Sequence, residues 1–459
     1  MAHAAYAELV ERLRAHHASL DTRDLQWRRR ELQALRAMIV EHEQQLFDAL
    51  HADLRKCRVE CCLTETGFVV GEIDHALGHM ERWSRPLGTY TPIYLQPAHS
   101  RVIWEPLGVA LIMGPWNYPF HLVIAPLVPC LAAGNAAVLK PSELAPATAA
   151  AIGELVPQYL DPDVVAVVQG GVPETTVLLE QRFDRIFFTG SARVGRIVMA
   201  AAARHLTPVT LELGGKCPCV VDGSARLDVA ARRVANGKFA NAGQTCVAPD
   251  YVLVQRDIAD EFVAGLADAV RRFYGPDPQQ SPDYARIINA RHHRRLVELL
   301  ARGEAVVGGE HDEADLYLAP TVLRGADPGS PVMQEEIFGP ILPVLEVADA
   351  DEALAFVNQR PRPLALYVFA EDPEVVARLT HMTRAGGTCV NETLLHLLVS
   401  DLPFGGVGES GTGTYHGEWG FREFSNARAI LDRSTVFDLG LRYPPYSDRD
   451  EALLRHMRG

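Results

Sequence analysis

The stretch that decides the fold runs from residue 108 to residue 143 and reads GVALIMGPWNYPFHLVIAPLVPCLAAGNAAVLKPSE. Residues 109–113 and 136–139 have the length and composition of buried strands. The nearly apolar segment between them, from Leu122 onward, predicts a buried helix. Two prolines and a Gly-Asn pair interrupt it, and it is short for a membrane span, which needs about 20 apolar residues. The stretch therefore predicts a strand–helix–strand unit inside a soluble protein.

Short apolar segments of the same kind recur downstream, separated by helical segments such as 147–159 and 193–203. Strands this apolar, alternating with helices, indicate a parallel sheet that is covered on both faces. This is the outline of a dinucleotide-binding domain, although many unrelated functions share it. The further strand candidates are 164–168, 185–188, 209–213 and 219–221.

Three other regions complete the organisation of the chain. Residues 24–50 predict one amphipathic helix, and strands are expected around 93–95 and 101–104. A second α/β series begins near residue 228 and runs to about residue 400, with helices at 228–239 and 259–273 around a strand at 251–254. The glycine-rich segment PFGGVGESGTG (403–413) suggests backbone packed closely against the active site or another subunit.

Composition excludes several classes of protein. The net charge of −14 argues against nucleic-acid binding, which needs clustered Lys and Arg. Eight cysteines in 459 residues are too few for a disulfide scaffold, and their spacing does not match a zinc site, so no metal is expected. The N-terminus lacks the apolar stretch of a secretory signal, and the last residues lack a tail anchor. We expect a cytoplasmic protein without a membrane anchor.

Cys246 is the candidate nucleophile, within the glycine-containing loop NAGQTCVAP (241–249). A loop can present the sulfur beside backbone N–H donors. Taken alone, a cysteine is more often an inert, small apolar residue.

Glu212 is the candidate general base, at the end of a strand in LELGGK (211–216). Desolvation at an apolar strand end raises the pKa of a carboxyl group toward the range that suits a base. The alternative, a carboxylate bonded to the Gly214 and Gly215 amides or to Lys216, is equally compatible with the sequence.

Two segments suggest nucleotide binding. GSARVG (190–195) follows a strand and opens a helix, where free amides can receive a pyrophosphate, but its G-x-x-x-x-G spacing is a weak signal by itself. KPSE (140–143) lies beyond the end of a strand, where Lys140 and Glu143 could bond ribose hydroxyls. The alternative makes Ser142 a helix cap and leaves Glu143 to favour the helix dipole.

Asn117 lies in GPWNYP (114–119), between a buried strand and an apolar helix. Its side-chain amide could donate to a developing oxyanion. A turn-forming asparagine is the more common use of this residue type.

Together and in this order, these segments resemble the aldehyde dehydrogenase superfamily. The matching motifs are PWNYP, KPSE, FTGS, LELGGK, GQTC, EEIFGP and PFGG, which extend from residue 115 to residue 406. The segments GQTCVAPDY and GVGESGTGTYHG are most similar to the class 3 branch, which includes coniferyl-aldehyde and fatty-aldehyde enzymes.

The resemblance implies a role for each matching position. Cys246 would be the nucleophile, Glu212 the general base, and Asn117 with the Cys246 backbone N–H the oxyanion hole. The positions implied for the cofactor are Lys140 and Glu143 at the adenosine ribose, Gly190, Ser191 and Gly195 at the adenine and pyrophosphate, Trp116 in the cleft, Glu336 at the nicotinamide ribose and Phe338 beside the ring.

The resemblance also implies the architecture and the partners. We expect an α/β fold with a Rossmann-like cofactor domain (1–92 and 114–222), a second α/β catalytic domain (223–402) and a small β bridging element (93–113 and 403–435). The expected assembly is a homodimer. The expected substrates are medium-chain aliphatic or aromatic aldehydes, with NAD as cofactor and NADP tolerated.

Two alternatives remain open on the sequence. A relative could release acyl-CoA or acyl-phosphate from the same thioester, although Glu212 argues against that branch. A structural protein could keep the fold without catalysis, which the three catalytic motifs argue against.

Overall fold

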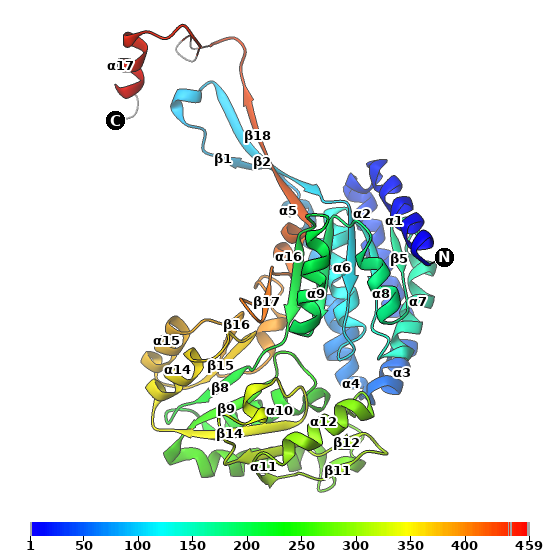
Figure 1. The fold of residues 1–459 in the computed structure, drawn as a ribbon, viewed down its shortest axis with the longest axis vertical. Helices are drawn as coiled ribbons and strands as arrows, with labels where there is room; N and C mark the ends of the chain where they lie inside the picture. Colours follow the sequence, from blue (N-terminus) through cyan, green and yellow to red (C-terminus); the bar gives the residue numbers. More distant parts are fainter. Residues whose placement is uncertain (1, 439, 441–442, 457–459) are drawn as a thin grey trace.

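The computed structural model describes residues 2–438, 440 and 443–456, and two parallel sheets dominate it (Figure 1). The first sheet has six strands in the order β17-β7-β6-β3-β4-β5. All its neighbours are parallel except the short edge strand β17. Its strands are β3 (Val109–Met113), β4 (Ala136–Lys140), β5 (Val165–Val167), β6 (Arg185–Gly190), β7 (Val209–Leu213) and β17 (Gly411–Thr412).

Helices surround this sheet and form its core with it (Figure 1). The apolar segment of the opening stretch forms α6 (His121–Ala133), which contacts β3 and β4 on one side and α2 and α5 on the other. Gly134 ends α6 with a φ of 91°, and a Cβ there would lie 2.6 Å from the Thr22 carbonyl. The other helices of this unit are α1 (Ala2–Ala18), α2 (Leu25–Glu41), α3 (Glu43–Leu54), α4 (Arg58–Cys61), α5 (Gly67–Trp83), α7 (Pro146–Tyr159), α8 (Val172–Leu179), α9 (Ala192–Ala203) and α16 (Gly417–Glu423).

The second sheet has seven strands in the order β10-β13-β14-β9-β8-β15-β16, parallel except for β10. Its strands are β8 (Pro218–Val221), β9 (Tyr251–Gln255), β10 (Glu304–Val307), β13 (Thr321–Arg324), β14 (Ile341–Val347), β15 (Ala365–Phe369) and β16 (Gly387–Val390). The accompanying elements are α10 (Leu227–Phe239), α11 (Ala259–Tyr274), α12 (Ala290–Leu300), α13 (Pro331–Gln334), α14 (Ala350–Asn358), α15 (Pro373–Met382) and the strand pair β11 (His311–Asp312) and β12 (Tyr317–Leu318).

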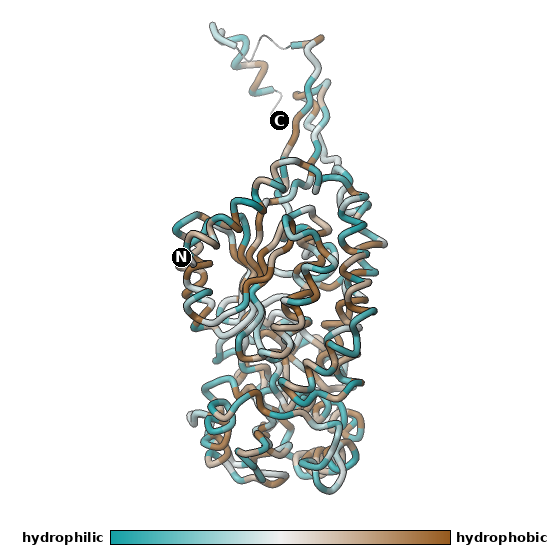
Figure 2. The backbone as a smooth tube through the Cα atoms, turned by 90° about the vertical axis from the view of Figure 1, so that its right-hand side faces the viewer, coloured by the Kyte–Doolittle hydropathy of each residue, from teal (hydrophilic) through white to brown (hydrophobic). Residues whose placement is uncertain are grey.

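A three-stranded antiparallel sheet projects from the first unit (Figures 1 and 2). It consists of β1 (Leu87–Thr89), β2 (Ala98–Pro106) and β18 (Ser425–Arg433), and α17 (Asp448–His456) lies beyond its tip. In Figure 2 the most hydrophobic backbone gathers inside the main body, yet the turn between β1 and β2 and the segment after β18 carry exposed apolar side chains. Ile93 is 82% exposed and Val436 is 95% exposed.

The structure corrects several details of the expected elements. The helix expected over 24–50 is two helices, α2 and α3, which separate at His42, where Nε2 contacts the Tyr159 hydroxyl at 3.0 Å. The strand expected at 93–95 is a 3-10 turn.

Two strands lie outside the unit expected for them. Residues 109–113 were assigned to the bridging element, but they form β3 of the six-stranded sheet, between β4 and β6. All five residues are buried, which is typical of a strand inside a parallel sheet covered on both faces. Residues 219–221, assigned to the cofactor domain, belong to β8, which pairs with β9 and β15 of the second sheet.

No helix within the described ranges has the length and apolarity that crossing a bilayer requires.

Candidate active site

Most of the expected site residues line a pocket of about 230 Å³. Eight of the eleven line it: Trp116, Asn117, Gly190, Ser191, Glu212, Cys246, Glu336 and Phe338. They come from the ends of β3, β6 and β7 in the first sheet and from loops of the second unit. The pocket therefore brings together chemistry from both sheets.

Cys246 follows a tightly wound loop. Asn241 and Ala242 have φ values of 51° and 49°, and Gly243 lies so close to the Gly339 carbonyl that a Cβ would approach it to 2.3 Å. Burial and the nearby Glu336 and Glu212 carboxyl groups raise the pKa of Cys246 to about 12, whereas the backbone amides of residues 246 and 247 act on the sulfur in the opposite direction. These amides are the donors that a thiolate or an oxyanion at this position would use.

Glu212 ends β7 and is 3% exposed. Among the described residues, neither of its carboxyl oxygens has a hydrogen-bond partner. Burial raises the pKa of Glu212 well above its usual value. Two of the partners considered from the sequence are engaged elsewhere: Gly215 N donates to Glu336 Oε1 at 3.2 Å, and Lys216 pairs with Asp250. A buried carboxyl group without a partner, facing a pocket, is the arrangement expected of a base.

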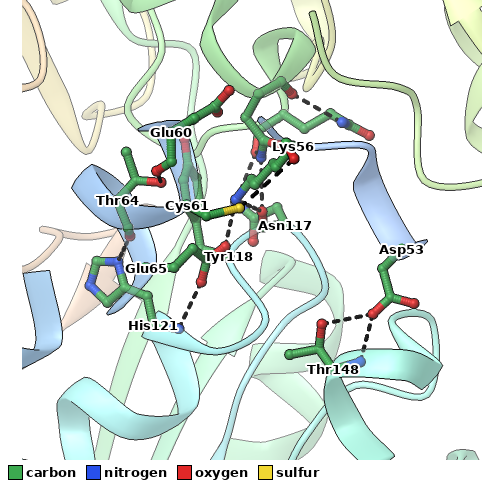
Figure 3. A network of polar contacts seen from close by, with 12 residues as sticks. Asp53, Lys56, Glu60, Cys61, Thr64, Glu65, Asn117, Tyr118, His121 and Thr148 are labelled. Carbon is green, nitrogen blue, oxygen red and sulfur yellow. Dashed lines mark hydrogen bonds and ion pairs between the residues drawn. The ribbon is translucent and has the colours of Figure 1, made fainter. Parts of the chain in front are cut away.

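Asn117 lies in the loop between β3 and α6 and is 2% exposed. Its Nδ2 donates to the Gln244 carbonyl at 2.9 Å, two residues before Cys246. The backbone carbonyl of Asn117 accepts hydrogen bonds from Asn241 Nδ2 at 2.8 Å and from Lys56 Nζ at 3.0 Å (Figure 3). The asparagine is thus tied to the cysteine loop and is more than a turn residue.

The two ends of the G-x-x-x-x-G segment lie in different surroundings. Gly190 and Ser191 line the pocket at the start of α9, and the Ser191 hydroxyl accepts from Val194 N at 3.5 Å as the helix cap. Gly195 is outside the pocket lining, and a Cβ there would lie 2.8 Å from Leu213 Cδ2. Its lack of a side chain lets α9 pack closely on β7, and the ligand contact implied for it stays a prediction.

Lys140 and Glu143 stand apart from the pocket lining, at the carboxyl end of β4. Lys140 is 4% exposed, and its Nζ donates to the Pro141 carbonyl at 2.8 Å and lies 3.5 Å from Glu143 Oε2. Burial lowers the pKa of Lys140. The pair lies at the edge where ligands bind in parallel sheets.

Glu336, Phe338 and Trp116 form another part of the pocket wall. Glu336 packs against the backbone of Gly214, where a Cβ would lie 2.1 Å from the carboxylate. Burial first, and then the charge of Asp250, raise the pKa of Glu336 to about 8. The rings of Phe338 and Trp116 meet edge to face, with their centroids 5.3 Å apart.

The sequence analysis missed several lining residues, among them Thr189, His292 and Arg295. Arg295 Nη1 donates to the Glu336 carbonyl at 3.3 Å, and the His292 ring lies 4.9 Å from that of Trp116. The basic run RHHRR (291–295) in a strongly acidic chain was a signal that could have indicated α12.

The residues present fit a nicotinamide dinucleotide. The amino end of α9 opens on the pocket, where its free amides suit a pyrophosphate. The Thr189 hydroxyl is buried there without a partner among the described residues. Gly214 lets the Glu336 carboxylate, which is implied to hold the nicotinamide ribose, come close to the backbone, an approach that a side chain would block.

Comparison with known proteins agrees with this geometry. The sequence profile of the aldehyde dehydrogenase family matches residues 2–430. Aldehyde dehydrogenase family 3 member A2 of Mus musculus is 49% identical over 448 residues, which cover 96% of this chain and 91% of the relative. The dimeric NADP-preferring aldehyde dehydrogenase of Canis lupus familiaris is 47% identical, over 96% of this chain and 97% of its own.

Two solved structures are similar across nearly the whole chain. The substrate-bound Staphylococcus aureus AldH superposes with a TM-score of 0.95 at 42% identity, covering 98% of each chain. The NAD-dependent aldehyde dehydrogenase from Sinorhizobium meliloti has a TM-score of 0.87 at 30% identity, covering 95% of this chain and 88% of its own.

Proposed function

The chain belongs to the aldehyde dehydrogenase family and oxidises aldehydes with NAD(P), and we propose that the reaction passes through a thioester on Cys246. One observation carries this proposal: Cys246, Asn117 and the unpartnered Glu212 line the same pocket as the amino end of α9. The cofactor is NAD, with NADP accepted.

The first step forms a bond between the Cys246 sulfur and the aldehyde carbon. The thiol proton passes to water first, because the thiolate is the form of Cys246 that attacks the carbon. The negative charge that develops on the aldehyde oxygen is stabilised by the Asn117 amide and the Cys246 backbone N–H. When bound, the nicotinamide would supply the acceptor for the hydride that leaves this carbon as the thioester forms on Cys246.

Hydrolysis completes the cycle. Glu212 accepts a proton from a water molecule, and the resulting hydroxide attacks the thioester carbon. The carboxylate product leaves, and the Cys246 sulfur is released. Burial keeps the Glu212 carboxyl group out of competing ion pairs, which suits the proton transfer from water.

Replacing Asn117 by alanine should lower kcat/KM for aldehydes on the order of 10²-fold, since one lost oxyanion donor costs about 3–4 kcal/mol of barrier. Steady-state kinetics with a saturating cofactor would measure the loss. Asn358→Ala is a matched control, because this asparagine is exposed and its Nδ2 donates only to the Met382 carbonyl. Equal activity of the Asn117→Ala and wild-type proteins would remove Asn117 from the mechanism.

Glu143 is proposed to accept the ribose hydroxyls of NAD and to repel the 2′-phosphate of NADP. Glu143→Gln removes the charge at nearly constant size and should raise the NADP-to-NAD ratio of kcat/KM by about tenfold, equivalent to roughly 1.4 kcal/mol. Glu154→Gln, an exposed carboxylate on α7, should leave that ratio unchanged. An unchanged ratio in both variants would show that Glu143 does not select the cofactor.

We further propose medium-chain aliphatic or aromatic aldehydes as substrates. The apolar side chains of Leu122, Trp116 and Phe338 line the pocket together with the reacting residues. A small or strongly charged aldehyde would leave this apolar wall without a partner.

The remaining proposals concern organisation. The six-stranded unit is proposed to hold the cofactor and the seven-stranded unit to carry the nucleophile. The projecting β1-β2-β18 sheet, with the exposed Ile93 in the turn between β1 and β2 and the exposed Val436 just after β18, is proposed to form a homodimer, as the word dimeric in one relative's name suggests. A cytoplasmic location is supported by the eight free cysteines.

The proposed function is tested by absorbance at the reduced-nicotinamide band, with a panel of aliphatic and aromatic aldehydes and each cofactor. Formation of NAD(P)H with apolar aldehydes supports the proposal and identifies the substrate class. A protein that reacts with none of them would contradict it.

A further inference from the structure

A buried ion pair lies directly behind the Asn117 loop (Figure 3). Lys56 is 1% exposed and Glu65 is fully buried, and Lys56 Nζ lies 2.5 Å from Glu65 Oε1. Neither residue lines the pocket. Two charges removed from water are costly unless their remaining hydrogen bonds are filled, so the other partners of the pair show what it holds in place.

Glu65 is directed inward by an irregular turn. Residues Cys62–Thr66 form a π-helical turn between α4 and α5, a feature that is frequent at functional sites. Gly67 follows it, and a Cβ there would lie 2.3 Å from the Cys62 carbonyl. The second carboxyl oxygen, Glu65 Oε2, accepts from the backbone N of His121 at 2.8 Å. Glu65 thereby fixes the first residue of α6, where the Asn117 loop ends.

Lys56 reaches the loop itself. Its Nζ donates to the Asn117 carbonyl at 3.0 Å and lies 3.7 Å from the centre of the Tyr118 ring. The Tyr118 hydroxyl is hydrogen-bonded to Thr245 Oγ1 at 2.8 Å, and Thr245 directly precedes Cys246. The ammonium group therefore contacts two consecutive residues of the loop, and both are hydrogen-bonded to the segment that carries the nucleophile.

We propose that the Lys56–Glu65 pair is a positioning element, which holds the Asn117 amide in register with the Cys246 sulfur. This inference rests on the proposed function, because it assigns the pair an effect through the oxyanion donor. The route runs from Glu65 to the start of α6, from Lys56 to the Asn117 carbonyl, and from Asn117 Nδ2 to the Gln244 carbonyl in the cysteine loop.

The test removes both charges together, so that neither is left buried without its partner. The double variant Lys56→Met/Glu65→Gln keeps an acceptor for His121 N and should lower kcat/KM by at least about tenfold, since small displacements of reacting groups are costly. Glu65→Gln alone, which is nearly isosteric, should show a loss in the same direction. It provides the measurement if the double variant does not fold.

A double-mutant cycle distinguishes positioning from a general structural effect. In an Asn117→Ala background, the same double change should cost less than about twofold, because the group it positions is gone. A second readout needs no cofactor: acylation of Cys246 by p-nitrophenyl acetate, which passes through the same oxyanion, should slow in parallel. Cofactor affinity, measured by fluorescence titration with NADH, should stay within about twofold.

The matched control is a second ion pair, Arg185 with Glu423, which is partly buried, with side chains 11% and 21% exposed. Arg185 begins β6, at the end of the strand opposite the pocket residues Thr189 and Gly190. Arg185→Met/Glu423→Gln should keep the wild-type kcat/KM within about twofold.

Three results would overturn the inference: no loss in the Lys56 and Glu65 variants, an equal loss with and without Asn117, or an equal loss in the Arg185/Glu423 control. A failure of the proposed function would look different. The wild-type protein would then oxidise no aldehyde, or Asn117→Ala would match it.

Discussion

Replacing Cys246 by serine is expected to lower NAD(P)H formation from every aldehyde by at least about 10⁴-fold, as the loss of a nucleophile does in other covalent enzymes. A serine hydroxyl gives up its proton far less readily than a thiol, and in this buried pocket even the pKa of the Cys246 thiol is raised to about 12. Absorbance at the reduced-nicotinamide band measures the effect.

Cys389→Ser is the matched control, because Cys389 is also a half-buried free thiol but lies outside the pocket. This variant should keep the wild-type rate. If Cys246→Ser turned over aldehydes as fast as the wild type, the activity would belong to another site.

Replacing Glu212 by glutamine is expected to separate the two halves of the cycle. The variant should release a burst of about one equivalent of NAD(P)H and then turn over about 10³-fold more slowly, within the range typical of general-base catalysis. Glutamine keeps the shape of the side chain but cannot accept the proton from water. Rapid-mixing absorbance would show the burst, and wild-type turnover without a burst would contradict the role of Glu212.

The pH dependence follows from the same residue. Burial raises the pKa of Glu212 well above 4.5, and only its deprotonated form can act as a base. As the pH falls through this raised pKa, the base form is lost, so wild-type kcat should fall at a higher pH than an ordinary carboxyl group would dictate. The Glu212→Gln variant should lack this limb of the kcat profile.

Much of the first sheet could be predicted because its strands are continuously apolar. Buried parallel strands such as β3 and β4 stand out against the helices between them. The resemblance to the aldehyde dehydrogenase family is confirmed, and its motifs indicated eight residues that the structure brings to one pocket.

Other features depend on tertiary contacts that local pattern does not reveal. The pairing of β8 with the second sheet is set by β9 and β15, which lie about 30 and 150 residues downstream. Gly195 resembles a ligand-binding glycine in sequence, yet its place against Leu213 appears only once α9 packs on β7. The pairing of Lys56 with Glu65 could not be predicted from the sequence either, because it depends on the π-helical turn that directs Glu65 inward.

The central claim is that a thioester forms on Cys246. Its most direct test is the mass of the Glu212→Gln protein, quenched with acid after mixing with an aldehyde and NAD and then mapped by peptide mass spectrometry. We expect one acyl group per chain, on the peptide that contains Cys246. An unmodified Cys246 peptide after a full burst of NADH, or an acyl group on another residue, would contradict it.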